Sequence, residues 1–137
     1  MTLSTLIDRV RAATGPDREI DADVYEALGY QVKRRPVRHS SVHKSHATSV
    51  SWRYLDSGRW LAMEYFTASL DAVVALIERE MPGAEYEYEL TNIYGIAQAT
   101  VGLNFSAGTP PSERRKDGNV VLALLAAFLS AKQSEQP

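Results

Sequence analysis

The sequence predicts an α+β fold in which an antiparallel four-stranded sheet, made of two hairpins, packs with helices. Apolar residues recur at helical spacing in four segments, apolar and polar residues alternate in four others, and turn-forming residues separate most of them. The expected order is helix, helix, strand, strand, helix, strand, strand, helix. Because a helix or a sheet must bury its apolar face, we expect the helices to cover one or both faces of this sheet.

Two amphipathic helices open the chain. The first is capped by Thr2 or Ser4 and ends near Gly15. The second can be capped by Asp17, and Gly29 can supply the left-handed residue that ends it. The apolar stripes that predict these helices are Leu3, Leu6, Ile7 and Val10 in the first and Ile20, Val24, Ala27 and Leu28 in the second.

Alternation of apolar and polar residues predicts the two hairpins. In residues 48–54 larger side chains alternate with serine and arginine, and a turn at Gly58 leads to a second strand over residues 60–66. Residues 85–90 and 97–103 alternate in the same way, so we expect them to pair as the second hairpin.

Two further segments lack both periods. Residues 30–47 contain Pro36 and collect serine, lysine, arginine and histidine, which indicates a long loop or an irregular edge. Residues 106–118 contain Gly108, Pro110, Pro111 and Gly118. This composition is typical of a mobile connector. Neither segment is expected to contribute a strand.

The two remaining helices differ in character. The third begins after Thr67 or Ser69, ends by Met81, and has one apolar face. The fourth is capped by Asp117 or Asn119 and is apolar nearly all round. We therefore expect the fourth helix to lie against the sheet with other elements over it.

Composition places the chain among ordinary globular domains. With 137 residues, 45% of them hydrophobic and 23% charged, we expect one domain over residues 1–132 and a frayed tail over 133–137. The absence of cysteine fits a reducing compartment, and the N-terminus lacks the pattern of a secretory signal. The longest apolar run, Val120 to Leu129, would rise about 15 Å as a helix, half of a bilayer core. A cytoplasmic protein without a membrane partner is expected.

Three blocks of sequence, taken in order, resemble a known family. The first runs from Leu6 through an Ala-Ala-Thr turn to the acidic helix start Asp17–Ala22, the second is Phe66–Ala72, and the third is the alanine- and leucine-rich helix Val120–Ala131. Together they resemble the short, uncharacterised phage and prophage proteins described as having an α-β-α (ABA) sandwich domain. The chain departs from that family at Lys116–Asn119, where members have a small-residue and Thr-Pro segment.

The resemblance implies an origin more than a chemistry. It covers about half of the chain and implies an accessory protein of a phage or prophage in a bacterial host cell. No activity, cofactor or catalytic residue is established for the family, so no site residue is carried over. We predict no cofactor.

The charge pattern has one unusual feature, a basic segment. None of the 17 acidic residues lies between Glu26 and Asp56, whereas six of the 15 basic residues do. These six residues are Lys33, Arg34, Arg35, Arg38, Lys44 and Arg53. Three partners could neutralise them: the chain's own acidic helices, an acidic protein surface, or nucleic acid.

A noncatalytic protein-interaction module is the favoured interpretation, with a host or phage protein of acidic surface as the partner. The predicted binding residues are Arg34, Arg35, Arg38 and Lys44, with Arg114, Arg115 and Lys116 as a second basic patch that folding can bring alongside. The alternative is a nucleic-acid-binding protein that uses the basic segment 33–53. Trp52, Tyr54 and Trp60 lie nearby for base stacking, but their alternation fits core packing better, and the net charge of −2 disfavours a polyanion.

Metal binding and catalysis are less favoured. His39, His43 and His46 are spaced as on one helical face, but the intervening serines disfavour a helix, and a solvated, pH-responsive loop is the simpler interpretation. The glutamates at 85, 87 and 89 fit the solvent face of a strand better than an acid–base pair. The sequence contains no Gly-x-Ser-x-Gly elbow and no phosphate-binding glycine loop. A hydrolase is the third interpretation.

Overall fold

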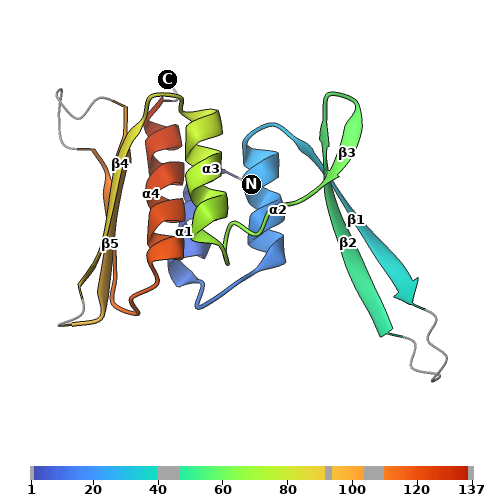
Figure 1. Ribbon diagram of the computed structural model, residues 1–137, viewed down its shortest axis with the longest axis horizontal. Coiled ribbons are helices and arrows are strands. Elements are labelled where there is room, and N and C mark those ends of the chain that lie inside the picture. Colours follow the sequence, from blue (N-terminus) through green and yellow to red (C-terminus); the bar gives the residue numbers. More distant parts are fainter. Residues whose placement is uncertain (1, 40–46, 92–93, 104–109, 136–137) are drawn as a thin grey trace.

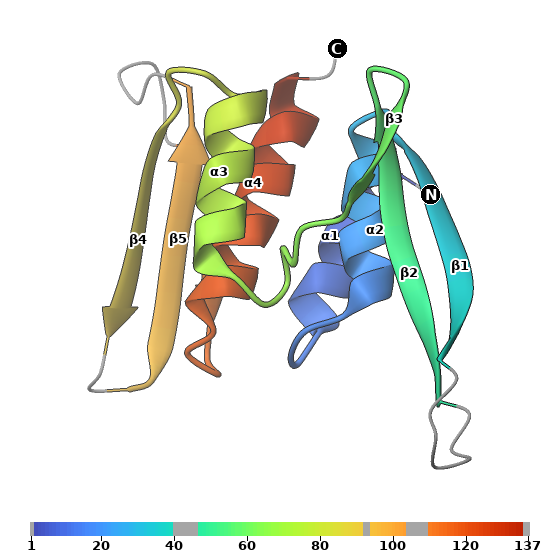
Figure 2. The ribbon, with the colours of Figure 1, turned by 45° about the vertical axis from the view of Figure 1, so that its right-hand side comes forward.

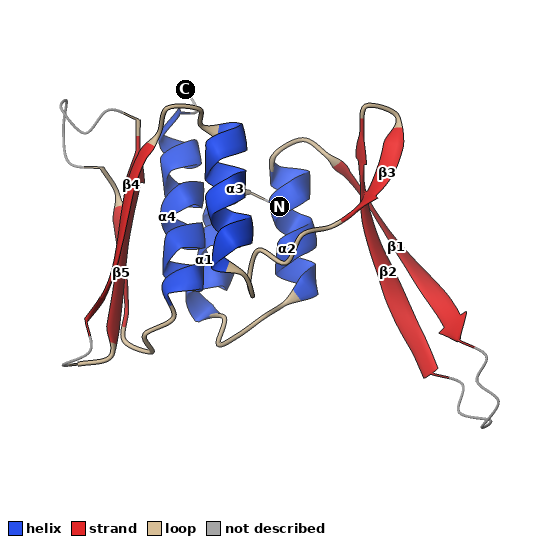
Figure 3. Ribbon diagram, viewed as in Figure 1, coloured by secondary structure: helices blue, strands red, loops and turns tan. Residues whose placement is uncertain are grey.

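Two separate three-stranded antiparallel sheets lie on either side of the helices (Figures 1 and 3). The computed structural model describes residues 2–39, 47–91, 94–103 and 110–135, with only the backbone described at 37–39 and 47–49. Along the chain the order is α1, α2, β1, β2, β3, α3, β4, β5, β6, α4. The predicted single four-stranded sheet and the predicted order are therefore wrong, although the fold is α+β.

The first two helices begin where their caps predict. In α1, Leu3–Ala12, the Thr2 hydroxyl accepts a hydrogen bond from the Thr5 amide. In α2, Arg18–Ala27, the Asp17 carboxylate accepts from the amides of Glu19 and Ile20. Gly29 then turns the chain with φ of 96°, in the left-handed region that glycine adopts without steric cost. The helix ends are thus encoded locally.

Sheet A contains β1, Gln31–His39, β2, Ala47–Asp56, and β3, Arg59–Ala62, in that order. The β2–β3 hairpin confirms the first predicted hairpin, but β1 lies where a loop was expected. The sequence of β1 does not show the alternation of apolar and polar residues that predicts a strand. Its helix-facing positions include Arg34 and Pro36, and Val32 is the one aliphatic residue with them.

Sheet B contains β4, Glu85–Thr91, β5, Ile96–Gly102, and β6, Ser112–Arg115. The β4–β5 hairpin confirms the second prediction, whereas β6 lies in the segment expected to be a connector. In β6 the side chains that face the helices are charged. Glu113 is buried because it pairs with Arg11 of α1, with an N–O distance of 2.6 Å, so the strand does not show the usual polarity pattern.

The last two helices supply much of the core. In α3, Leu70–Glu80, the Ser69 hydroxyl caps the first turn. In α4, Val120–Glu135, the Asn119 side chain accepts from the Leu122 amide at 3.0 Å. All residues from 122 to 129 are buried, which confirms the predicted position of this helix. It continues past residue 132, so the described part of the expected tail is helical.

The two sheets cover different helices. The apolar surface of α4 is covered by sheet B on one side and by α1 and α3 on the other, and sheet A covers α2 (Figures 1 and 2). The buried residues of both sheets and all four helices belong to one cluster. The layers are therefore sheet, helices, sheet, the reverse of the α-β-α order that the family resemblance implies. In the described ranges, no helix is both long and apolar enough to cross a membrane.

Candidate binding surface

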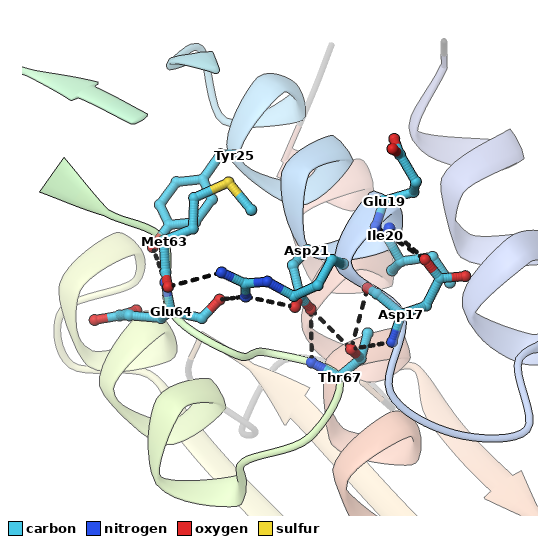
Figure 4. A network of polar contacts seen from close by, with 9 residues as sticks. Asp17, Glu19, Ile20, Asp21, Tyr25, Met63, Glu64 and Thr67 are labelled. Carbon is cyan, nitrogen blue, oxygen red and sulfur yellow. Dashed lines mark hydrogen bonds and ion pairs between the residues drawn. The ribbon is translucent and has the colours of Figure 1, made fainter. Parts of the chain in front are cut away.

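Two of the blocks that carry the family resemblance meet at a buried junction between α2 and the segment that leads from β3 to α3 (Figure 4). The Thr67 hydroxyl accepts a hydrogen bond from the Asp17 amide at 2.8 Å and donates to Asp21 Oδ1 at 2.9 Å. The Thr67 amide donates to the same Asp21 oxygen at 2.8 Å, and Arg18 Nη1 donates to Oδ2 at 2.9 Å. Asp21 is 1% exposed, and its burial raises the pKa of the carboxyl group.

Further contacts bind the same segment to α2. Arg18 donates to the carbonyl oxygens of Met63 and Glu64 at 3.1 and 2.7 Å and lies 3.9 Å from the centre of the Tyr65 ring. The hydroxyl of Tyr25 accepts from the Glu64 amide at 3.0 Å. Since both carboxylate oxygens of Asp21 already have protein donors, the junction holds the chain in place and does not present an open acid or base.

Arg34, a predicted binding residue, is occupied inside the molecule. It donates to the Glu19 carboxylate of α2 at 2.8 Å, lies 3.6 Å from a Glu26 oxygen, and has its guanidinium 5.2 Å from the Trp52 ring centre. These hydrogen bonds raise the pKa of Arg34. For this residue the chain's own acidic helix is the partner.

The opposite side of sheet A is different. The register pairs Lys33 with Arg53 and Arg35 with Ser51, so all four side chains project away from the helices. Together with Trp60 of β3 they line a hollow of about 270 Å³, and the Lys33 ammonium lies 5.3 Å from the Trp60 ring centre. We call the surface formed by Lys33, Arg35, Ser51, Arg53 and Trp60 the basic face.

The basic face carries unbalanced charge. Lys33 and Arg53 lie directly opposite each other on adjacent strands, an arrangement that is unfavourable for like charges. Arg35 and Arg53 are exposed, and neither they nor Lys33 form an ion pair with a side chain in the described part of the protein. A bound anion would relieve this repulsion.

The second predicted basic patch lies elsewhere. Arg114 and Lys116 are exposed on or beside β6, which belongs to sheet B, at the other side of the helices from β1 (Figure 1). Arg115 is structural, because it donates to the carbonyl oxygens of Val10 and Ala13 at the end of α1. The expectation that folding brings the two patches together is wrong, because they are on different sheets.

The side chains of the other candidates lie outside the described part of the chain. These are Arg38 and Lys44 of the predicted basic surface and the three histidines, His39, His43 and His46. Among residues with described side chains, no cluster of histidine, aspartate and glutamate could hold a metal ion. Glu85, Glu87 and Glu89 are exposed on the outer side of β4, as predicted for the solvent face of a strand.

The aromatic residues divide between core and surface. Tyr54 is buried and stacks on Tyr25 with ring centres 4.2 Å apart, and Trp52 packs against the core, as expected. Trp60 is 39% exposed, so its assignment to the core is wrong. The sequence shows Lys33 and Arg53 only as members of the basic segment. Their opposition follows from the pairing of β1 with β2, and the sequence predicts a loop or irregular edge in place of β1.

In comparisons with known proteins, no family model matches the chain, and no curated protein or solved structure is significantly similar to it.

Proposed function

We propose that this protein is a noncatalytic binding module that uses the basic face of sheet A to hold an acidic protein surface. One observation carries the proposal: three exposed cations, Lys33, Arg35 and Arg53, lie around Trp60. Two of them are directly opposed, and none is paired with a described acidic side chain. Carboxylates of a partner would supply the missing counter-charges, and the Trp60 ring would supply apolar contact area.

The residue types favour a protein partner. Tryptophan and arginine are the side chains most enriched among the residues that dominate protein–protein binding energy. The net charge of −2 opposes long-range attraction of a polyanion, whereas nucleic-acid-binding domains are usually strongly basic. A protein whose acidic residues are confined to one patch avoids most of that repulsion.

A second candidate, single-stranded nucleic acid, is favoured by one specific observation. The exposed Trp60 ring lies beside three cations, and a base could stack on the ring while phosphates contact Lys33, Arg35 and Arg53. Against it, Lys33 already lies over the ring, and Trp60 is the one exposed aromatic side chain of the basic face.

We further propose an origin as a phage or prophage accessory protein acting in the cytoplasm of a bacterial host. The support is the ordered resemblance of the three sequence blocks, two of which form the junction between Asp17, Asp21 and Thr67. The position of the gene among phage genes would test this proposal. A gene surrounded by housekeeping genes in every genome that carries it would contradict it.

Fluorescence of Trp60 can test the basic face. The chain has two tryptophans, so Trp52→Phe leaves Trp60 as the reporter. In this background we expect a short oligoglutamate peptide, whose few charges resemble a confined acidic patch, to change the emission. Arg35→Glu should weaken binding about tenfold, since reversing one charge here removes an attraction of that order.

Lys116→Glu is the matched control, because it changes the net charge equally but lies beside the other sheet. Equal weakening by both substitutions would show that binding follows net charge and would contradict a local site. Tighter binding of an oligothymidylate than of the short oligoglutamate peptide, lost on Arg35→Glu, would establish the nucleic-acid alternative instead.

A further inference from the structure

Each sheet leaves two strand edges without a partner strand in the described part of the chain, and these edges differ in length and charge. The strands β3 and β6 have four residues each, whereas β1 has nine and β4 has seven. Short edge strands are a common protection against pairing with other chains, so the long edges of β1 and β4 are the ones open to it.

The outer side of β4 is acidic. Glu85, Glu87 and Glu89 occupy alternate positions on it, all exposed, and we call them the acidic row. On the inner side of the same strand, Tyr88 and Leu90 are 48% and 53% exposed, so the helices leave apolar surface uncovered next to the free edge. An added strand would cover these two side chains.

The outer side of β1 is basic. Lys33 and Arg35 occupy alternate positions with the same period as the acidic row. Successive side chains on one side of a strand are spaced about 6.6–6.8 Å apart in both strands, so both cations can lie opposite glutamates at once. Pairing of β4 with β4 would instead oppose carboxylates, and pairing of β1 with β1 would oppose cations.

We propose that the occupant of the β4 edge is the β1 edge of a second copy of this chain. The main-chain groups of the two edges would pair as in any sheet, and Lys33 and Arg35 of one copy would neutralise the acidic row of the next. This inference rests on the proposed function, because it names the acidic surface that two cations of the basic face, Lys33 and Arg35, bind.

The geometry allows the assembly to grow beyond a dimer. The two edges belong to sheets on opposite sides of the helices (Figures 1 and 2), so a copy that has used its β1 edge still offers its β4 edge. A contact between two different surfaces of this kind generates chains or rings and not a closed dimer. Pro36 lacks an N–H, so the pairing would involve Gln31 to Arg35.

Sedimentation velocity of the full-length protein tests the proposal. We expect a concentration-dependent series of species beyond the dimer at about 50 mM salt that dissociates at about 500 mM, where charges are strongly screened. The double variants Lys33→Glu/Arg35→Glu and Glu87→Lys/Glu89→Lys should each lower the association constant about a hundredfold, because each opposes like charges. Asp71→Lys, an exposed change on α3, should leave association unaltered.

Mixing the two double variants gives the decisive result. The acidic β1 of one complements the basic β4 of the other, so the mixture should associate again, with slowed amide exchange in residues 31–35 and 85–91. Failure of the mixture to associate, when both variants fold, would overturn the β1–β4 pairing. Wild-type protein that stays monomeric at low salt would overturn it as well. If that monomer still binds the short oligoglutamate peptide, the proposed function stands. If it does not, both fall.

Discussion

Asp21 shows how one buried charge fixes a long crossing of the chain. The segment after β3 must pass from sheet A to α3, and its backbone amide at Thr67 has no strand or helix partner. The Asp21 carboxylate accepts that amide, the Thr67 hydroxyl and the Arg18 guanidinium, so burial of the charge is compensated by three donors.

Removal of this carboxylate should therefore be costly. We expect Asp21→Ala to lower the free energy of unfolding by about 2–4 kcal/mol, because it leaves a buried amide and part of a guanidinium without an acceptor. Urea denaturation monitored by circular dichroism would measure the change. Asp21→Asn keeps one carbonyl oxygen for Thr67 and should lose less. Asp71→Ala, an exposed aspartate on α3, is the control, and an equal loss there would contradict the role of the junction.

At the scale of elements, the connection between β6 and α4 depends on a charged pair. Arg115 donates to the Asp117 carboxylate at 2.6 Å and also to the Ala13 carbonyl oxygen at the end of α1. Asp117 Oδ1 accepts in addition from the Asn119 amide at 3.1 Å. These hydrogen bonds, above all those from Arg115, lower the pKa of Asp117 from 3.8 to about 2. The pair thus links a sheet B strand, two helices and a turn.

This link should make stability depend on acid pH in a defined window. Because the folded-state pKa of Asp117 is lowered, its stabilising contribution is complete above the ordinary value of 3.8 and is lost as the pH falls towards 2. We expect Asp117→Asn to be less stable than wild type at pH 7, with a difference that shrinks as the pH falls from 3.8 and disappears only below about pH 2. Thermal unfolding across this range would measure the difference, and a difference that stays constant down to the lowest pH would contradict the assignment.

At the scale of the whole molecule, one core joins both sheets. Arg34 links β1 to α2 through Glu19, and Glu113 links β6 to α1 through Arg11, while buried side chains form one continuous cluster between them. Neither sheet has an apolar core of its own. A three-stranded sheet with one buried face depends on the helices that it covers.

Sheet A should consequently unfold together with the helices that it covers. Both tryptophans lie in sheet A, so their fluorescence reports that sheet, whereas far-ultraviolet circular dichroism reports mainly the four helices. We expect the two signals to follow one transition in urea with the same midpoint, as in other single domains of this size. Loss of the fluorescence signal at a clearly lower denaturant concentration would show that sheet A detaches first.

The local features of this protein could be predicted from the sequence. The caps at Thr2, Asp17 and Ser69, the left-handed turn at Gly29, the two hairpins and the burial of α4 all depend on neighbouring residues or on a repeating period. These signals act over a few residues, so they are visible without knowledge of the partner elements.

Only the tertiary structure determined which charged side chains are paired with the helices and which are left without a counter-charge on the basic face. Strands β1 and β6 place Arg34, Glu113 and Arg115 towards the helices, and their carboxylate, guanidinium and carbonyl partners come from helices distant in sequence. Both strands therefore read as loops, and without them neither the two sheets nor the opposition of Lys33 and Arg53 could be foreseen. A strand shows an apolar pattern in the sequence only where its buried face is covered through apolar contacts.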